Sequence, residues 1–378
     1  MTQTLQAAQG VCAPRFSAVR SAFERNFSER GEVGAAFCLW VDGQPIVDLW
    51  AGARDATGAL PWTRDTVANV WSTTKGVTAA CFAMLVDRGQ ISYEDKVADH
   101  WPSFAAEGKG EITIGMLLSH QAGLSGFTSP AVVEDLYARR LAAERLAAQA
   151  PIWPPGSACG YHAISVGLLA AELFERVEGR SLKEFVADEL ASARGLDIAI
   201  GLEPSRNDQA AEMLAPAGMG SGDIGSFNPA QVAALTNPGL DPRLPNTLAW
   251  RAAEIPSANG FSNARALAGL YASLLPGATA PLASPAVIAQ ATEVRIEGRD
   301  LVLDLFARWG AGFLVNSEQL YGPNPEAFGH SGWGGSFAFA DPKADVAMAY
   351  TMNQMSQLLR GDPRGVALID AVYGALDE

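Results

Sequence analysis

Ser72 and Lys75 are a pair of residues whose types and spacing could support catalysis. A serine three positions before a lysine is an arrangement in which the amine activates the hydroxyl as a nucleophile without a histidine. Residues three apart share one face of a helix, and apolar residues recur at helical spacing between positions 77 and 85. We therefore predict that Ser72 lies near a helix N-terminus, where backbone amides favour the negative charge that develops on an attacked carbonyl. The alternative is that Ser72 only caps this helix and Lys75 is a solvated surface residue.

Lys75 needs a partner, because an ordinary lysine is protonated at neutral pH and accepts a proton only when burial or a neighbour lowers its pKa. Tyr161 lies between the turn-forming residues 154–156 and a helical pattern that starts near residue 164. Its phenol could therefore point into a cleft and share the role of base with the amine. The alternative is a half-buried aromatic side chain that anchors the loop.

A third candidate element is the glycine-rich segment 328–336, which contains His330 and Trp333. Glycine-rich segments that enter a strand let the backbone approach a ligand closely and present amide donors. One such amide, together with that of Ser72, would form a two-donor oxyanion hole. The alternative is a glycine-rich bend that leads into an edge strand.

The elements that must position these residues are strands at the two ends of the chain and helices between them. Asp42-Gly43 separates two apolar runs and predicts a hairpin. The strands that we expect are 35–41, 45–51, 308–315, 335–340 and 346–352. This pattern predicts an α+β fold with an antiparallel sheet of about five strands, flanked by the terminal helices. We assign residues 1–70 and 285–378 to the sheet domain and residues 71–284 to an inserted, mainly helical domain.

Helical periodicity and cap signals predict the remaining elements. Ser181 and Glu184 form a capping box, and Gly179 ends the helix before it. The helices that we expect are a first one with Phe16, Val19, Phe23 and Phe27 on one side, then 131–150, 164–177, one opening at 181, 263–275 and 364–376. Two segments, 217–225 and 237–245, are expected to be long loops because they are rich in glycine or proline.

The composition excludes several classes of function. A net charge of −14 over 378 residues argues against nucleic acid or an anionic membrane as a partner and favours neutral small molecules. The four cysteines are scattered and the four histidines lie far apart, so no metal site, cofactor or disulfide frame is expected. The N-terminal residues lack a signal-peptide pattern and no run approaches the ~20 apolar residues of a membrane span. We therefore expect a cytoplasmic protein, and its oligomeric state stays open.

Taken together and in order, the three elements resemble those of the serine β-lactamases and penicillin-binding proteins, and most of all the family VIII carboxylesterases. The resemblance covers the chain from about residue 14 to its end. The segments that carry it are Trp71-Ser72-Thr73-Thr74-Lys75-Gly76, Leu117-Leu118-Ser119-His120-Gln121-Ala122-Gly123-Leu124, Pro154-Pro155-Gly156, Gly160-Tyr161-His162-Ala163, Gly329-His330-Ser331-Gly332-Trp333-Gly334-Gly335 and Phe339-Ala340-Asp341-Pro342.

The resemblance implies a β-lactamase/DD-peptidase-like fold and a role for each element. Ser72 is expected to be acylated, with Lys75 and Tyr161 as general base and no metal or cofactor. The amides of Ser72 and Trp333 are expected to form the oxyanion hole. The residues expected to contact the substrate are Trp333, His330, Gly332, Gly334 and His162. We interpret His120 as structural.

Two departures from the β-lactamase pattern indicate an esterase. Tyr161-His162-Ala163 lacks the substrate-gripping amide of Tyr-x-Asn, and His330-Ser331-Gly332 replaces the lysine of Lys-Thr-Gly with a group that is mostly neutral at pH 7. We therefore expect a carboxylesterase that acts on small, short-acyl esters. The alternatives are a β-lactamase or peptidase activity, and a catalytically silent binding protein on the same scaffold.

Overall fold

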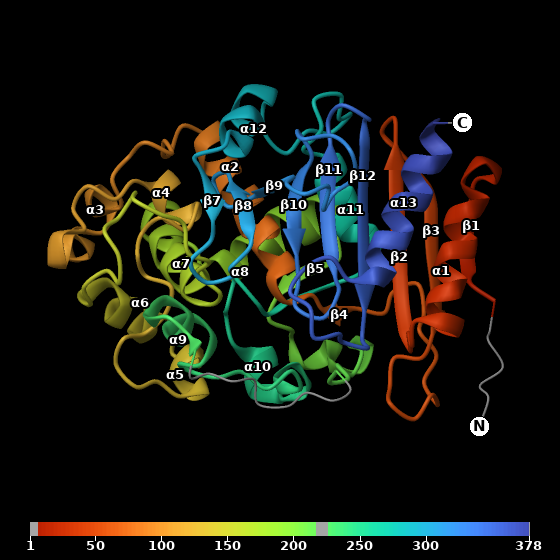
Figure 1. The fold of residues 1–378 in the computed structure, drawn as a ribbon, viewed down its shortest axis with the longest axis horizontal. Helices are drawn as coiled ribbons and strands as arrows, with labels where there is room; N and C mark the ends of the chain where they lie inside the picture. Colours follow the sequence, from red (N-terminus) through yellow and green to blue (C-terminus); the bar gives the residue numbers. More distant parts are fainter. Residues whose placement is uncertain (1–6, 217–225, 378) are drawn as a thin grey trace.

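The computed structural model describes residues 7–216 and 226–377. An antiparallel sheet of nine strands forms one side of the molecule, with helical layers on both faces and a mainly helical region beside it (Figure 1). Its strand order is β1-β3-β2-β12-β11-β10-β9-β8-β7. The strands are β1 (Gln9–Cys12), β2 (Gly34–Val41), β3 (Gln44–Gly52), β7 (Ile296–Arg299), β8 (Phe306–Trp309), β9 (Leu314–Val315), β10 (Phe328–Ser331), β11 (Phe337–Asp341) and β12 (Val346–Met352).

The centre of the sheet joins the two ends of the chain. β2 and β3 form the expected hairpin, in which Asp42 and Gly43 have φ values of 49° and 70°. Positive φ at both turn residues matches the right-handed twist of the strands. β2 then pairs along its length with β12, from Val41 opposite Val346 to Ala35 opposite Met352. The fold class predicted from the sequence is confirmed.

The predicted count of about five strands is wrong, because the sheet has nine. The additional strands are short and lie at or toward its edges. β1 and β7 are four residues long and largely solvent-facing, so they carry no apolar alternation. The expected strand 308–315 is two strands, β8 and β9, which antiparallel pairing holds around the turn at Gly310 and Gly312.

Helices cover the sheet and fill the middle of the chain. α1 and α13 pack side by side on one face of the sheet, and α11 packs against β2, β11 and β12 on the other (Figure 1). The helices are α1 (Ser17–Glu29), α2 (Thr74–Asp87), α3 (Val97–His100), α4 (Ile114–Leu118), α5 (Val133–Tyr137), α6 (Arg139–Ala148), α7 (Ser165–Glu178), α8 (Leu182–Phe185), α9 (Pro229–Leu235), α10 (Leu248–Ala252), α11 (Ala264–Ala272), α12 (Pro285–Thr292) and α13 (Pro363–Asp377).

Most local expectations hold, with one correction. Gly179 ends α7 in the left-handed conformation, and the Ser181–Glu184 capping box opens α8. The single helix expected over 131–150 is two helices, α5 and α6, broken at Ala138. The segment 237–245 is a loop, as expected, whereas the loop predicted for 217–225 lies outside the described residues.

A small second sheet connects the large sheet to the helical region. It contains β4 (Ala68–Asn69), β6 (Gly260–Ser262) and β5 (Ile198–Ile200), in that order, and β4 leads directly toward Ser72. The division of the chain at residues 70 and 284 stays a prediction. α11 contacts the large sheet although it belongs to the range assigned to the helical domain.

The four cysteines are free thiols, and three of them are buried. Across residues 7–216 and 226–377, the helices are too short or too polar to cross a lipid bilayer.

Candidate active site

The turn that carries Ser72 is held in an unusual conformation. Trp71 begins the short 3₁₀ turn before α2 and has a φ of 45°, a left-handed value that a bulky residue adopts only under strain. The Val70 amide donates to Gly260 O at 2.9 Å and the Thr74 hydroxyl donates to Trp71 O at 2.5 Å. These bonds fix the turn, and Ser72 stays partly exposed while its neighbours are buried.

Lys75 lies one turn into α2 and reaches Ser72, as the spacing predicts. Its Nζ is 3.0 Å from Ser72 Oγ, 2.7 Å from Ala163 O and 2.9 Å from Ser257 O. The lysine is 4% exposed, and no carboxylate within the described residues forms an ion pair with it. The solvated-surface interpretation of Lys75 is therefore wrong.

Burial lowers the pKa of Lys75 well below its usual value. A neutral amine has two N–H donors and one lone pair. The two carbonyls, Ala163 O and Ser257 O, accept the two donors, so the lone pair is left for the Ser72 hydroxyl. The arrangement can therefore remove a proton from Ser72.

Tyr161 completes the group around the amine. Its ring centroid lies 4.7 Å from Lys75 Nζ, and the side chain is buried. Burial raises the pKa of Tyr161 above its usual range, Asp300 raises it further, and a hydrogen bond with Ser72 acts in the opposite direction. The phenol therefore remains protonated at neutral pH next to the serine.

The third element is held directly against the Ser72 turn. Thr73 Oγ1 and Ser336 Oγ are 3.1 Å apart, and the Ser336 hydroxyl donates to Val70 O at 2.9 Å. Gly332 is required at the contact, because a Cβ there would come within 2.3 Å of Val70 O and of Ser336 Oγ. Close backbone approach therefore explains a glycine at this position.

Two backbone amides at this site are without a hydrogen-bond acceptor among the described residues. The neighbouring amides of Gly332, Gly334 and Gly335 donate to carbonyls at 2.7–3.2 Å. In contrast, the amides of Ser72 and Trp333 have no acceptor within the part of the chain that the structure describes. The centroid of the Trp71 ring lies 5.0 Å from that of Trp333, so the glycine-rich segment 328–336 is packed against the Ser72 turn.

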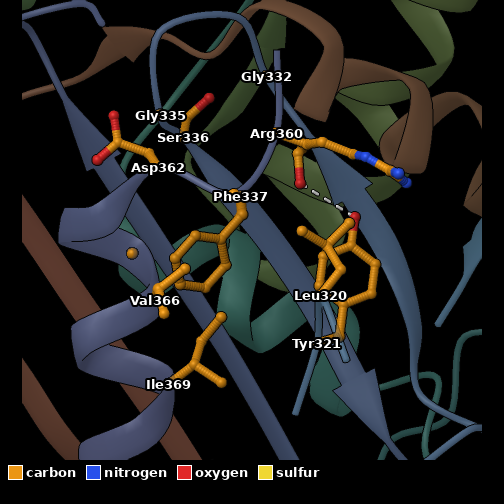
Figure 2. A pocket seen from close by; sticks show the side chains of 13 residues that line it. Leu320, Tyr321, Gly332, Gly335, Ser336, Phe337, Arg360, Asp362, Val366 and Ile369 are labelled. Atoms are coloured by element: carbon orange, nitrogen blue, oxygen red, sulfur yellow. Dashed lines mark hydrogen bonds between the residues drawn. The ribbon is translucent and has the colours of Figure 1, made fainter. Parts of the chain in front are cut away.

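A small pocket opens beside the serine. The pocket is narrow, and its walls are mainly apolar. The lining residues are Ser72, Tyr161, Leu303, Trp309, Leu314, His330, Ser331, Trp333, Leu359 and Arg360. A second hollow, of about 310 Å³, lies behind the glycine-rich turn against α13 and shares Ser331 and Arg360 with the first (Figure 2).

His330 contributes a neutral ring to this pocket. Its Nδ1 is 2.8 Å from Ser331 O, so Nδ1 carries the proton and Nε2 does not. Nε2 has no hydrogen-bond partner among the described residues. Burial, and to a smaller extent Lys75, lowers the pKa of His330 to about 3. The site therefore lacks a cation where a β-lactamase would have its lysine.

Three of the residues expected to contact substrate, His162, Gly332 and Gly334, do not line this pocket, and Gly332 lines the second hollow instead. His162 is fully buried behind Tyr161: its Nε2 accepts the Leu124 amide at 3.0 Å, and its Nδ1 lies 2.6 Å from Gly160 O. Gly334 contacts Met352 and Met355 instead. His120 accepts the His162 amide through Nδ1 at 3.2 Å, which agrees with its structural interpretation.

Sequence reasoning missed several groups that shape the site. The carbonyls of Ala163 and Ser257 hold the Lys75 amine, but backbone acceptors leave no signal in residue type. Trp309 lines the pocket and stacks on Tyr161 at 5.8 Å with an angle of 11° between the rings. It lies in a predicted strand, where an aromatic residue is most simply explained by core packing.

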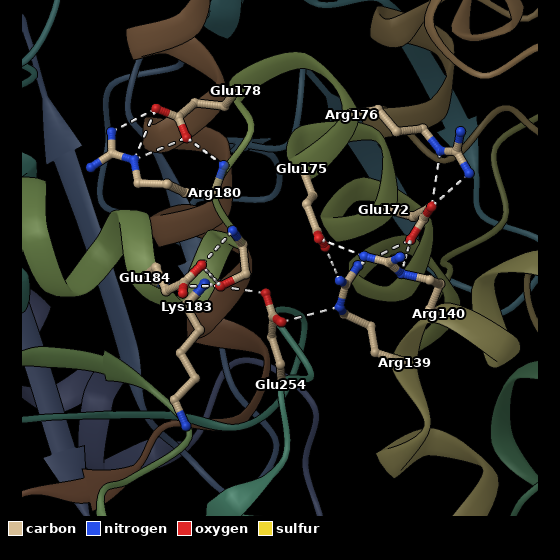
Figure 3. A network of polar contacts seen from close by, with 11 residues as sticks. Arg139, Arg140, Glu172, Glu175, Arg176, Glu178, Arg180, Lys183, Glu184 and Glu254 are labelled. Carbon is tan, nitrogen blue, oxygen red and sulfur yellow. Dashed lines mark hydrogen bonds and ion pairs between the residues drawn. The ribbon is translucent and has the colours of Figure 1, made fainter.

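A network of ion pairs holds the loop that presents the Ser257 carbonyl. Arg139 contacts Glu172, Glu175 and Glu254, and Glu254 also accepts the Lys183 amide at 3.1 Å (Figure 3). Arg139 is the first residue of α6, so the break at Ala138 starts the helix at the residue that bridges these acids. Glu254 stands three residues before Ser257 and ties that loop to the helical region.

No group of three or more acidic, histidine or cysteine side chains is placed to hold a metal ion anywhere in residues 7–216 or 226–377. The site brings together the Ser72 hydroxyl, the Lys75 amine and the Tyr161 phenol, beside a pocket that Ser72, Tyr161 and Trp333 line.

These features define a serine acyl-transfer site on a β-lactamase-like fold, and comparison with known proteins agrees. Residues 20–371 match the β-lactamase family. The chain belongs to this family.

Its relatives include esterases and a penicillin-binding-protein homologue. The chain is 33% identical over 373 residues to the esterase/β-lactamase LipL of Mycobacterium tuberculosis, which covers 94% of this chain and 85% of that protein. A crystal structure of a family VIII carboxylesterase is 44% identical, with a TM-score of 0.92 over 97% of this chain and 99% of that one. A penicillin-binding-protein homologue from Caulobacter crescentus is 45% identical, with a TM-score of 0.91 over 98% and 100% of the two chains. The resemblance inferred from the sequence is confirmed.

Proposed function

We propose that the protein is a carboxylesterase that hydrolyses small, neutral, short-acyl esters through an acyl-enzyme at Ser72. The observation that carries the proposal is the buried Lys75 amine, 3.0 Å from Ser72 Oγ, with its two N–H groups directed to carbonyls. The esterase names of two close relatives support ester as the substrate class.

In the first half-reaction, Ser72 Oγ attacks the ester carbonyl carbon while its proton passes to Lys75 Nζ. The carbonyl oxygen becomes an oxyanion, which the amides of Ser72 and Trp333 hold. The tetrahedral intermediate collapses, the bond from carbon to the alcohol oxygen breaks, and Lys75 and Tyr161 return the proton to the leaving alcohol.

In the second half-reaction, water attacks the acyl carbon and the same pair accepts its proton. A second tetrahedral oxyanion forms and is held in the same way. It collapses when the bond to Ser72 Oγ breaks, and the serine oxygen takes the proton back. The carboxylic acid leaves, and the site returns to its starting state without a metal or a cofactor.

The pocket supports a small and uncharged substrate, because its walls are mainly apolar and the one guanidinium in its lining, that of Arg360, is already paired with Glu318. The pocket beside Ser72 is also narrow. His330 is neutral and offers no charge partner to the carboxylate of a β-lactam. The free thiols support a reducing, cytoplasmic location, and the net charge of −14 supports a partner that is neither nucleic acid nor membrane.

The test is turnover of nitrophenyl esters from acetate to octanoate beside a chromogenic cephalosporin. We expect the short esters to be fastest, slow cephalosporin turnover at most, and loss of ester turnover in Ser72→Ala. Ser157→Ala is the matched control, because Ser157 is an exposed serine in the turn after Pro154. Ester turnover that survives in Ser72→Ala would refute the mechanism. Faster cephalosporin than ester turnover would favour the β-lactamase alternative.

A further inference from the structure

Asp300 is a fully buried carboxylate next to the candidate active site, in the turn between β7 and β8. Its Oδ1 accepts the backbone amides of Tyr161 at 2.9 Å, Val302 at 2.9 Å and Leu303 at 3.0 Å. Its Oδ2 accepts the indole N–H of Trp309 at 3.2 Å. The carboxylate therefore binds the backbone of the candidate catalytic tyrosine directly.

All four groups around this carboxylate are neutral donors. No arginine or lysine in the described residues forms an ion pair with Asp300. A protonated carboxyl would need an acceptor for its own O–H, and each of these four partners already points an N–H at it. The donor geometry thus matches a carboxylate that accepts four hydrogen bonds. A buried charge that is held only by neutral dipoles is costly to a fold, which makes a function for it worth testing.

Three of the four bonds hold Tyr161 or residues that line the same pocket. One holds its backbone, and another holds Trp309, whose ring stacks on the phenol at 5.8 Å and 11°. A third holds Leu303, which lines the same pocket as Ser72. The Asp300 side chain therefore holds the backbone of Tyr161, the Trp309 ring that stacks on its phenol, and Leu303 in the wall of the pocket.

We propose that Asp300 is a positioning residue, whose carboxylate holds Tyr161 and Trp309 so that the phenol hydroxyl faces Ser72 as a neutral proton donor. The inference rests on the proposed function and assigns a separate proton-transfer step to each of two residues. Lys75 takes the proton of Ser72, and Tyr161 stays protonated and hands its proton to the leaving alcohol, after which Lys75 reprotonates it.

Electrostatics act in the same direction. The negative charge of Asp300 adds to burial in raising the pKa of Tyr161. The titratable groups that face the phenol are Lys75 from α2, His120 after α4, His330 from β10, Tyr321 and Asp300 itself. Among these, Asp300 carries the negative charge.

The experiment compares Asp300→Asn, Trp309→Phe and the double variant. An asparagine Oδ1 still accepts the three backbone amides, whereas its Nδ2 would oppose the indole N–H. Trp309→Phe removes that conflict, so the double variant changes the charge while it keeps the backbone contacts. Asp304→Asn is the matched control, since Asp304 is an exposed acid of the same turn, paired with Arg299.

We expect Asp300→Asn to lower kcat by roughly 100-fold with little change in KM, because a misplaced catalytic group costs about that much. In the double variant the alkaline limb of kcat/KM should move about one pH unit lower than in Trp309→Phe, because loss of a nearby negative charge favours the phenolate. Asp304→Asn should match the wild type. Ultraviolet titration of the phenols, with Tyr161→Phe to assign the signal, gives a second readout that does not depend on turnover.

Two outcomes overturn the proposal. One is an unchanged kcat in Asp300→Asn. The other is a loss of kcat that follows a lower melting temperature, while the alkaline limb and the phenol titration stay in place, since that result describes a stabilising residue only. Wild type and Ser72→Ala are measured in the same assay. Ester turnover that is absent in wild type, or kept in Ser72→Ala, contradicts the proposed function rather than the role of Asp300.

Discussion

Lys75 and Arg139 are both cationic side chains withdrawn from water, yet their surroundings are opposite. Lys75 is 4% exposed and meets two carbonyls and one hydroxyl. The side chain of Arg139 is 11% exposed and meets the carboxylates of Glu172, Glu175 and Glu254 (Figure 3). In the helical region, three carboxylates balance the charge of Arg139. In the site, no carboxylate among the described residues pairs with Lys75.

This difference separates a charge that stabilises the fold, that of Arg139, from an amine that is available for proton transfer, that of Lys75. A guanidinium stays charged in any protein, so Arg139 can be buried only beside acids. An amine responds to the same burial by losing its proton, and the low pKa that results gives the site its base. We infer that the missing counter-ion is what makes Lys75 reactive. Five experiments can break or sharpen this contrast.

The largest effect is expected for Lys75→Met, which keeps the shape of the side chain but removes the amine. Loss of the general base should lower kcat/KM at least about 1,000-fold, while the protein stays folded by circular dichroism. Lys96→Met is the matched control, because Lys96 is an exposed lysine paired with Glu111. A fall of less than tenfold in Lys75→Met would contradict the assignment of the base.

Arg139→Met should do the reverse and lower stability without changing the chemistry. It leaves three carboxylates without their shared partner, and breaking a buried pair costs about 3–5 kcal/mol. Urea unfolding measures this loss. Because Glu254 keeps its bond from the Lys183 amide, the loop that carries Ser257 should stay in place, and kcat of the folded protein should stay within twofold. The control is Arg243→Met, where the exposed pair with Asp241 should contribute little to the free energy of unfolding. Equal losses in the two variants would show that the network is not structural.

A smaller effect is expected where backbone contact, rather than charge, builds the site. Gly332→Ala places a Cβ against Val70 O and Ser336 Oγ, which should push Trp333 away from Ser72. Loss of one oxyanion donor lowers kcat by about 100-fold. Gly374→Ala is the control: a Cβ there meets no atom within 4 Å, and a helical alanine should raise stability by about 0.5–1 kcal/mol. Normal kcat in Gly332→Ala would place the oxyanion elsewhere.

The smallest expected effect, when it is expressed per pH unit, is the decrease of kcat/KM at low pH. Below the lowered pKa of Lys75 the amine gains a proton and loses its lone pair, so the rate should fall about tenfold for each pH unit. His162 and His330, with pKa values of about 4 and 3, are neutral above pH 5 and do not add a limb there.

The sign of the pH effect on stability follows from the same residue. Unfolded Lys75 titrates near pH 10.5 and folded Lys75 well below it. Between these values the unfolded state binds the additional proton, so the free energy of unfolding should rise with pH. Urea titrations of wild type and Lys75→Met from pH 6 to 10 measure this slope, which the variant should lose. Identical slopes would mean that the lysine is charged in the fold.

The sequence predicted features that depend on local pattern or motif. The Asp42-Gly43 hairpin, the Ser181–Glu184 capping box and the Ser72–Lys75 contact depend on spacing over a few residues. Short edge strands such as β1 were missed because four largely exposed residues carry no periodic signal.

The parts of the site that depend on long-range packing could not be predicted in this way. Asp300 stands in Gly298-Arg299-Asp300, which is typical of an exposed turn, and only the folded chain brings it to Tyr161. His162 follows Tyr161 directly in the sequence, but its ring is turned away, into bonds with Leu124 and Gly160. Side-chain direction in a loop is set by contacts that are distant in sequence.

The pairing of β2 with β12 also has a consequence for how the chain is made. β2 leaves the ribosome early, whereas its partner begins only at Val346. Until then one edge of the β2–β3 hairpin has no strand beside it, and an open apolar edge is a site where chains associate wrongly. Trp333 lies in the same late part of the chain. Ser72 is therefore translated well before Trp333, whose amide is the second oxyanion donor that we propose. The nascent protein can therefore neither close its sheet nor assemble its site until residues 333–352 have been translated, and we expect protection of this edge to limit the yield of active enzyme in rapid expression.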